Sequence, residues 1–200
     1  MSPQRGGKPM NYKTDKKAAI FMADGCEEIE ALTVVDILYR AGIPLTKVSI
    51  SDSLSVTSSH EVTFLTDTTV SLLDFDEYDM LILPGGMPGT IHLDACRRLT
   101  EQVTAFAKAG KQIAAICAAP SVFARLGLLQ GKKATCNPSK EGALKEGGAI
   151  LTYEQVTVTG NIITSQAMGT AIPFALAIVA HYLGQETADA LRENIIYKPQ

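Results

Sequence analysis

The sequence has little of what marks a secreted, metal-binding or nucleic-acid-binding protein. Its four cysteines form no C-x-x-C pair and are too sparse for a disulfide framework, which favours free thiols in a reducing compartment such as the cytoplasm. The three histidines have no metal-ligand spacing from the cysteines, so no metal site is expected. A net charge of −3 gives no basic field for nucleic acid, and no apolar run is long enough to cross a membrane.

The composition fits one globular domain. The chain has 200 residues, of which 46% are hydrophobic and 20% are charged, enough apolar material for a sizeable core. Residues 1–16 are polar and rich in glycine and proline, and they lack the apolar segment of a secretory signal. We therefore expect a disordered N-terminal extension over 1–16 and a single folded domain over 17–200.

Within that domain, segments of strand type alternate with segments of helical period. The strands are expected at 18–23, 46–50, 78–83 and 112–116, with hairpins at 55–65 and 156–164. The helices are expected from Ile29 to a stop at Gly42, and over 93–108, 170–183 and 187–194. This alternation predicts the α/β class, with a mainly parallel sheet covered by helices on both faces.

Polar and glycine-rich segments follow three of the buried strands. Asp24–Glu30, Pro84–Gly89 and Cys117 each come directly after a strand, and the carboxyl ends of parallel strands meet at one sheet edge. We expect these three segments to converge on one site. Glu27 and Glu28 are expected to be ordinary first-turn acids that complement a helix dipole.

Cys117 is the most informative single residue. It follows the apolar run Gln112–Ile116, has alanines after it, and precedes Pro120, which suits a first helical turn. This pattern fits a sharp strand-to-helix turn that exposes a nucleophile near a helix N-terminus, where the dipole favours a thiolate. It fits a buried core cysteine equally well.

Four segments together resemble a known family. Gly25–Glu30, Leu83–Gly86, Ala114–Pro120 and Thr164–Thr170 are similar to the hallmark segments of the ThiJ/PfpI superfamily, nearest the branch of the parkinsonism-associated deglycase and bacterial YajL. The match runs in order from about Lys17 to the C-terminal helix. The resemblance implies a flavodoxin-like three-layer α/β/α sandwich, usually a homodimer, with no organic cofactor or metal.

The resemblance also assigns roles to individual residues. Cys117 matches the reactive, easily oxidised cysteine, and Glu30 matches the carboxyl group that hydrogen-bonds to its sulfur. Gly86 and Ala118 match the positions whose backbone N–H groups face an oxyanion. Because an ionised carboxylate would repel a thiolate, we expect Glu30 to be protonated when Cys117 is ionised, so that the pair shares one proton.

Further positions belong to the implied pocket, and some depart from the family pattern. The pocket includes Gly85, together with Asn137 where some relatives have histidine, an amide that cannot shuttle protons. His60 stands in a hairpin where relatives have arginine, a position that can approach the pocket across a dimer. Gln166 replaces an arginine found in part of the family. Cys136 is a candidate disulfide partner for Cys117, although sequence gives no distance between them.

Two function classes follow from this site. One is an enzyme that acts on small reactive carbonyls such as methylglyoxal, with glyoxalase or deglycase chemistry at Cys117. The other is a non-enzymatic redox sensor or chaperone whose Cys117 is oxidised. A peptidase or amidotransferase lacks its base, because Ala118 stands where protease relatives have histidine and no suitable histidine follows.

Overall fold

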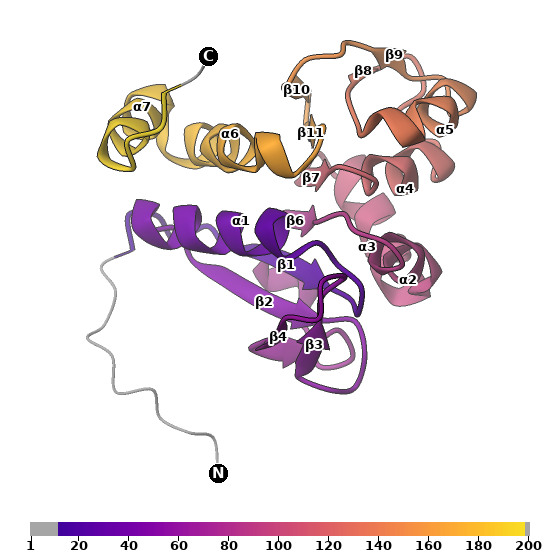
Figure 1. Ribbon diagram of the computed structural model, residues 1–200, viewed down its shortest axis with the longest axis horizontal. Coiled ribbons are helices and arrows are strands. Elements are labelled where there is room, and N and C mark those ends of the chain that lie inside the picture. Colours follow the sequence, from indigo (N-terminus) through magenta and orange to yellow (C-terminus); the bar gives the residue numbers. More distant parts are fainter. Residues whose placement is uncertain (1–11, 199–200) are drawn as a thin grey trace.

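The structure, a computed structural model, describes residues 12–198 and contains one mostly parallel sheet flanked by helices (Figure 1). Its seven strands lie in the order β10-β11-β7-β6-β1-β2-β5, and all neighbours are parallel except the β10–β11 pair. The strands of this sheet are β1 (Ala18–Met22), β2 (Leu45–Ser49), β5 (Thr68–Thr69), β6 (Met80–Leu83), β7 (Gln112–Ile116), β10 (Val156–Thr159) and β11 (Ile162–Ser165). The expected α/β class and mainly parallel sheet are therefore confirmed.

Seven α-helices surround the sheet within the described residues. They are α1 (Glu28–Ala41), α2 (Gly89–Ala95), α3 (Arg97–Lys108), α4 (Pro120–Arg125), α5 (Glu141–Glu146), α6 (Ala171–Leu183) and α7 (Gln185–Asn194). Figure 1 shows α6 beside α1. The helices α2, α3 and α4 pack against the other face of the sheet. This arrangement gives the three-layer sandwich that the sequence predicts.

Alternate residues of each strand point into two separate cores. In β1, Ala19 and Phe21 belong to a cluster that includes side chains of α2, α3 and α4. Ile20 and Met22 belong to the opposite cluster, with side chains of α1, α6 and α7. Both faces of the sheet are buried, which explains why the central strands read as continuous apolar runs.

Two local features differ from the sequence prediction. The helix expected over 93–108 is two helices that meet at Cys96, whose extended backbone (φ −75°, ψ 92°) interrupts the helical turn. A small unit of β8 (Lys133–Ala134), β9 (Ile150–Leu151) and α5 was not predicted. Its strands have two residues each, too short to give a periodic pattern.

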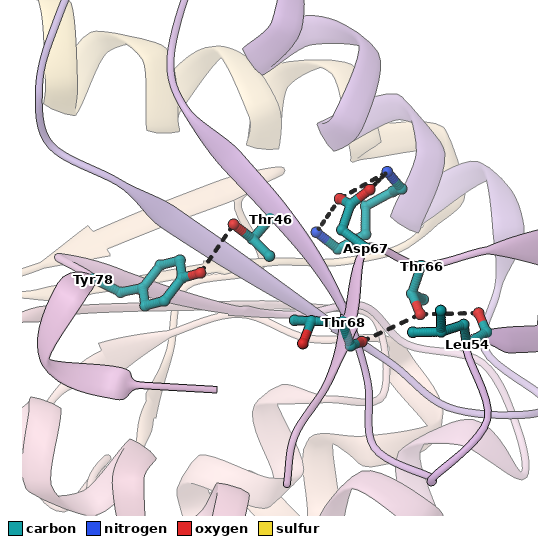
Figure 2. Close-up of polar contacts among 7 residues, drawn as sticks. Thr46, Leu54, Thr66, Asp67, Thr68 and Tyr78 are labelled. Carbon is teal, nitrogen blue, oxygen red and sulfur yellow. Dashed lines mark hydrogen bonds and ion pairs between the residues drawn. The ribbon is translucent and has the colours of Figure 1, made fainter. Parts of the chain in front are cut away.

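The hairpin β3 (Ser55–Thr57) and β4 (Thr63–Leu65) forms a separate two-stranded sheet. The segment after it is tied to the sheet edge (Figure 2): the Lys47 ammonium lies 2.7 Å from Asp67 Oδ1, and the Lys47 N–H donates to Asp67 Oδ2 at 3.0 Å. The Thr66 hydroxyl donates to the Leu54 carbonyl at 2.9 Å, across the base of the hairpin. These contacts fix where the hairpin leaves the domain.

Two further expectations concern the N-terminal extension and helices that could span a membrane. Most of the expected N-terminal extension, residues 1–11, lies outside the described residues. Between Tyr12 and Lys198, no helix combines the length and apolar character of a membrane span.

Candidate active site

The three segments that follow β1, β6 and β7 converge as expected. These strands are parallel neighbours, so their carboxyl ends lie at the same sheet edge. The segments are also directly bonded to each other, because the Glu27 N–H donates to the Gly85 carbonyl at 3.0 Å. Figure 1 shows the start of α1 at the end of the sheet where β6 and β7 finish.

Cys117 lies at the turn between β7 and α4. Its φ of 65° is in the left-handed region, which a residue with a Cβ adopts at a cost of about 1 kcal/mol. Both of its backbone polar groups are bonded: its N–H donates to Ser165 at 3.0 Å, and its carbonyl accepts from the Asn137 N–H at 2.8 Å. The side chain is partly exposed. Of the two interpretations left open, this geometry fits the sharp turn and not a core cysteine.

Glu30 is buried beside Cys117. It lies in the first turn of α1 with only 1% of its surface exposed, and it shares a hydrogen bond with the Cys117 thiol. The Gly85 N–H donates to Glu30 Oε2 at 2.9 Å. A Cβ at Gly85 would lie 2.6 Å from the Cys117 Cβ and 2.7 Å from Glu30 Oε2, so this position admits only glycine.

Burial controls the protonation of the pair. The pKa of Glu30 is raised to about 7, mainly by burial and also by the charge of Glu27, while hydrogen bonds from Cys117 and Gly85 oppose the increase. The pKa of Cys117 is raised to about 12, mainly by burial and also by the charge and hydrogen bond of the adjacent Glu30. The backbone N–H groups of Gly86 and Ala118 hydrogen-bond to the sulfur and lower that pKa.

The raised pKa values of Glu30 and Cys117 agree with a pair that shares one proton. They disagree with activation of the Cys117 thiol by the dipole of α4 alone. Between the two pKa values the pair holds one proton, and because the pKa of Cys117 is the higher of the two, the sulfur carries this proton in the predominant form and Glu30 is ionised. The expected thiolate-favouring effect of the helix N-terminus is outweighed, because α4 has only six residues and burial acts on the sulfur more strongly. The amides of Gly86 and Ala118 are what favours the thiolate here.

Glu27 has a structural role that the sequence interpretation missed. It is the N-cap of α1, with an extended backbone, and its carboxylate accepts a hydrogen bond from the Glu30 N–H at 2.6 Å. Together with its bond to Gly85, this cap fixes the first turn of α1 against the glycine loop. The spacing of three residues between Glu27 and Glu30 resembles a capping box and was the available signal, but glutamate is not a preferred N-cap.

Two residues proposed for the pocket, Asn137 and His60, take part in contacts of their own, and so does Gln166, which departs from the family pattern. The Asn137 side-chain oxygen accepts hydrogen bonds from the backbone and hydroxyl of Ser139, and the Asn137 backbone N–H donates to the Cys117 carbonyl. His60 is exposed, and its Nδ1 lies 3.0 Å from the Glu28 carboxylate, whose hydrogen bond and charge raise the pKa of His60. Gln166 donates to the Tyr153 carbonyl at 3.1 Å.

Cys136 and the acidic group near His60 do not extend the site. Cys136 is buried in the α2–α3–α4 core, whereas Cys117 packs against the opposite core, so the two side chains face different layers. Glu27, Glu28 and His60 have ligand atoms within 4.8 Å of one another. Their arrangement is accounted for by the helix cap and by the Glu28–His60 ion pair.

Comparison with known proteins gives the same family that the sequence resembles. The DJ-1/PfpI family model matches residues 16–181. The chain is 33% identical to the Parkinson disease protein 7 homolog of Danio rerio, covering 92% of this chain and 98% of that protein. It is 30% identical to the glutathione-independent glyoxalase DJR-1.2 of Caenorhabditis elegans, covering 88% and 94%.

Two further matches show how far the likeness extends. Protein DJ-1 homolog B of Arabidopsis thaliana is 35% identical over 92% of this chain, but the chain spans only 42% of that longer protein. The solved structure of oxidized Toxoplasma gondii DJ-1 superposes with a TM-score of 0.87 at 32% identity, covering 92% of this chain and all of that one. Sequence, fold and comparisons agree, and the chain belongs to the DJ-1/PfpI family.

Proposed function

We propose that this protein is a cysteine-dependent stress protein that converts small reactive α-oxoaldehydes such as methylglyoxal into hydroxy acids without a cofactor. The observation that carries the proposal is the buried Glu30 carboxyl group beside Cys117, so close that a Cβ at Gly85 would touch both residues, and hydrogen bonding from the N–H groups of Gly86 and Ala118 lowers the pKa of the same sulfur. The similarity to a C. elegans protein named a glutathione-independent glyoxalase supports this reaction class.

The first step uses the thiolate form of the pair. The Cys117 sulfur attacks the aldehyde carbon, a C–S bond forms, and the carbonyl π electrons move to oxygen to give an alkoxide. The N–H groups of Gly86 and Ala118 are suited to stabilise this oxyanion, since they already lie against the sulfur. Glu30, protonated in this form, donates its proton to give a neutral hemithioacetal.

The later steps move protons within the substrate. Glu30, now a carboxylate, removes the hydrogen of the former aldehyde carbon as a proton, and an enediolate forms, in which the hydroxyl proton of that carbon passes to the oxygen of the former ketone. Return of the proton to the neighbouring carbon gives a thioester of lactate, and water cleaves its C–S bond to release lactate and the thiol. The aldehyde carbon is oxidised and the ketone carbon is reduced, so the net reaction consumes only water and needs no external oxidant or reductant.

Direct measurement of lactate tests this proposal. Wild type should form lactate from methylglyoxal, and Cys117→Ser and Glu30→Gln should lose at least about a hundredfold in kcat/KM. Cys96→Ser, which removes a partly buried thiol between α2 and α3, is the matched control and should retain activity. Lactate formation that survives Cys117→Ser would overturn the proposal.

A redox sensor or chaperone is the second candidate, and the same amides favour it. Attack of the Cys117 thiolate on hydrogen peroxide breaks the O–O bond, oxidises the sulfur to sulfenic acid and releases hydroxide. The N–H groups of Gly86 and Ala118, with protonated Glu30, would hydrogen-bond the new oxygen. Absence of lactate, combined with selective addition of oxygen to Cys117 by mass spectrometry, would favour this function over the enzyme.

We also propose a homodimer and a cytoplasmic location. A groove between α1 and the α6–α7 pair has apolar lining residues, Ile29, Leu32, Ile172 and Ile195, beside the Arg40–Asp36 ion pair, and Ile29 is 47% exposed. Light scattering should give twice the chain mass, and Ile29→Asp should give a folded monomer; a monomeric wild type at micromolar concentration would contradict this.

The free cysteines support the proposed cytoplasmic location, because the cytoplasm is a reducing compartment. Recovery of the cellular protein with oxidised disulfides would contradict this location.

A further inference from the structure

The backbone of Cys117 is held on both sides by the last residues of β11. The Cys117 N–H donates to the Ser165 carbonyl at 3.0 Å. The Cys117 carbonyl accepts from the Asn137 N–H, and two residues before Asn137 the Thr135 N–H donates to the Thr164 hydroxyl at 3.0 Å. Two adjacent residues of one strand therefore fix the chain around the sulfur, Ser165 directly and Thr164 through the Thr135–Asn137 segment.

Ser165 is itself held by a chain of buried hydroxyl groups. Its side chain is fully buried, and its hydroxyl donates to the Gln155 carbonyl at 2.7 Å. The hydroxyl oxygens of Ser165 and Thr170 lie 2.7 Å apart, and the Thr170 hydroxyl accepts from the Ala167 N–H at 3.0 Å. The single proton of Thr170 can go to Ser165 or to the Ala167 carbonyl, 2.8 Å away. Donation to Ser165 completes a chain of hydrogen bonds from the Ala167 N–H to the Gln155 carbonyl.

This chain supplies direction that apolar packing would not. Buried hydroxyl groups lose their hydration and must be bonded, so an apolar pair would fill the same space without that cost. The hydroxyl bonds instead fix the orientation of Ser165, whose carbonyl accepts the Cys117 N–H. Cys117 needs such a partner, because a φ of 65° persists in a residue with a Cβ only where the surroundings hold it.

We propose that Ser165 and Thr170 are positioning residues for the Cys117 nucleophile. Their hydroxyl groups fix the Ser165 carbonyl, which holds the Cys117 backbone in the turn that brings its sulfur to the N–H groups of Gly86 and Ala118. Both residues act through the Cys117 backbone and not on the substrate. The inference rests on the proposed function in taking Cys117 as the reacting group, and it applies to carbonyl compounds and to peroxide alike.

A pair of identical substitutions provides the test. Thr170→Val removes the hydroxyl and keeps the shape of the side chain, and Thr170→Ser keeps the hydroxyl. Thr157→Val is the matched control, because Thr157 is 8% exposed and Thr170 is 9% exposed. The Thr157 hydroxyl is bonded to that of Thr152, outside the chain that leads to Ser165.

Hydrogen exchange followed by NMR measures the anchor of Cys117 itself. In Thr170→Val the Cys117 amide should exchange about three- to tenfold faster relative to the amide of Ile113, the effect of weakening one ordinary hydrogen bond. Ile113 lies earlier in β7 and donates to Asn161, so a general loss of stability would accelerate both amides equally. Thr157→Val should leave this exchange ratio unchanged, and Thr170→Ser should restore it.

Alkylation by iodoacetamide measures the sulfur. The thiolate forms one C–S bond and releases iodide, and peptide mass spectrometry gives the rate constant at Cys117 divided by that at Cys96 in the same chain. This ratio should fall about three- to tenfold in Thr170→Val, because a displaced sulfur loses the amides of Gly86 and Ala118 that favour the thiolate. Ser165→Ala should have the same effect and carries the test if Thr170→Val does not fold. An exchange ratio or an alkylation ratio that matches the Thr157→Val control would overturn the inference.

Lactate measurements separate this inference from the proposed function. Wild type that forms no lactate from methylglyoxal, while both ratios change as expected, would overturn the function and leave the positioning role standing. Lactate formation by wild type, with ratios that Thr170→Val and Ser165→Ala do not alter, would do the reverse.

Discussion

Replacement of Glu30 by glutamine should make the protein more stable at alkaline pH than at acidic pH, relative to wild type. The glutamine oxygen can still accept the Gly85 N–H, and its NH₂ group can still donate to the Cys117 sulfur, so the variant imitates protonated Glu30. It differs from wild type mainly in being unable to ionise.

The magnitude follows from the raised pKa of Glu30. The ordinary pKa of 4.5 applies to the unfolded chain, and burial raises the folded pKa to about 7. Below pH 4.5 both states hold the proton and stability is unaffected. As the pH rises from 4.5 through 7, the unfolded chain releases its proton first, so the folded state loses about 3 kcal/mol, at about 1.4 kcal/mol per pH unit.

Urea unfolding of both proteins across this range provides the assay. The free energy of unfolding of Glu30→Gln minus that of wild type should rise by about 3 kcal/mol between pH 4 and pH 8. Glu28→Gln is the control of opposite sign. Although partial burial opposes the shift, hydrogen bonds from the backbone, His60 and Ser58 lower the pKa of Glu28, so its loss should destabilise the protein fully above pH 4.5 and progressively less as the pH falls below 4.5. A difference for Glu30→Gln that stays constant from pH 4 to pH 8 would refute the reasoning.

Four further expectations concern single contacts. Gly85→Ala should reduce kcat/KM for lactate formation at least about tenfold, because the added methyl group would separate Glu30 from Cys117. The control Gly142→Ala, in open space on α5, should retain activity, and equal activities of the two variants would contradict the close packing at Gly85. Glu27→Ala should lower the free energy of unfolding by about 1 kcal/mol in urea titrations, and Glu27→Gln by less, because the amide still caps α1; equal losses would point away from the cap. Peroxide should not produce a Cys117–Cys136 disulfide in the native protein, and its detection by non-reducing peptide mapping would show that the two side chains can meet. The NMR titration midpoint of His60 should lie above 6.5 and return towards that value in Glu28→Gln; a midpoint that ignores this substitution would exclude the ion pair.

The sequence predicts the fold well where the strands are long and buried. The central strands β1, β6 and β7 are continuous apolar runs, and their shared direction follows from the helices between them. The break at Cys96 and the β8–β9 unit could not be predicted, because a single extended residue and two-residue strands leave no period in the sequence.

The sequence predicts which residues form the candidate site better than it predicts their pKa values and side-chain contacts. The convergence of the Cys117, Glu30 and Gly85 segments follows from topology alone. The direction of the Cys117 pKa does not, because it depends on how deeply the sulfur is buried and on which amides reach it. The Glu27 cap depends on one side-chain rotamer, and the separation of Cys136 from Cys117 depends on which layer each side chain enters.

The backbone of Cys117 is anchored by residues far along the chain, at Asn137 and Ser165. The orientation of the nucleophile is thus a property of the assembled tertiary structure, and a peptide spanning β7 and α4 would not reproduce it. Substitutions in β11 or after β8, remote from any substrate, are therefore positions where evolution could adjust reactivity without altering a single group that touches the reacting carbon.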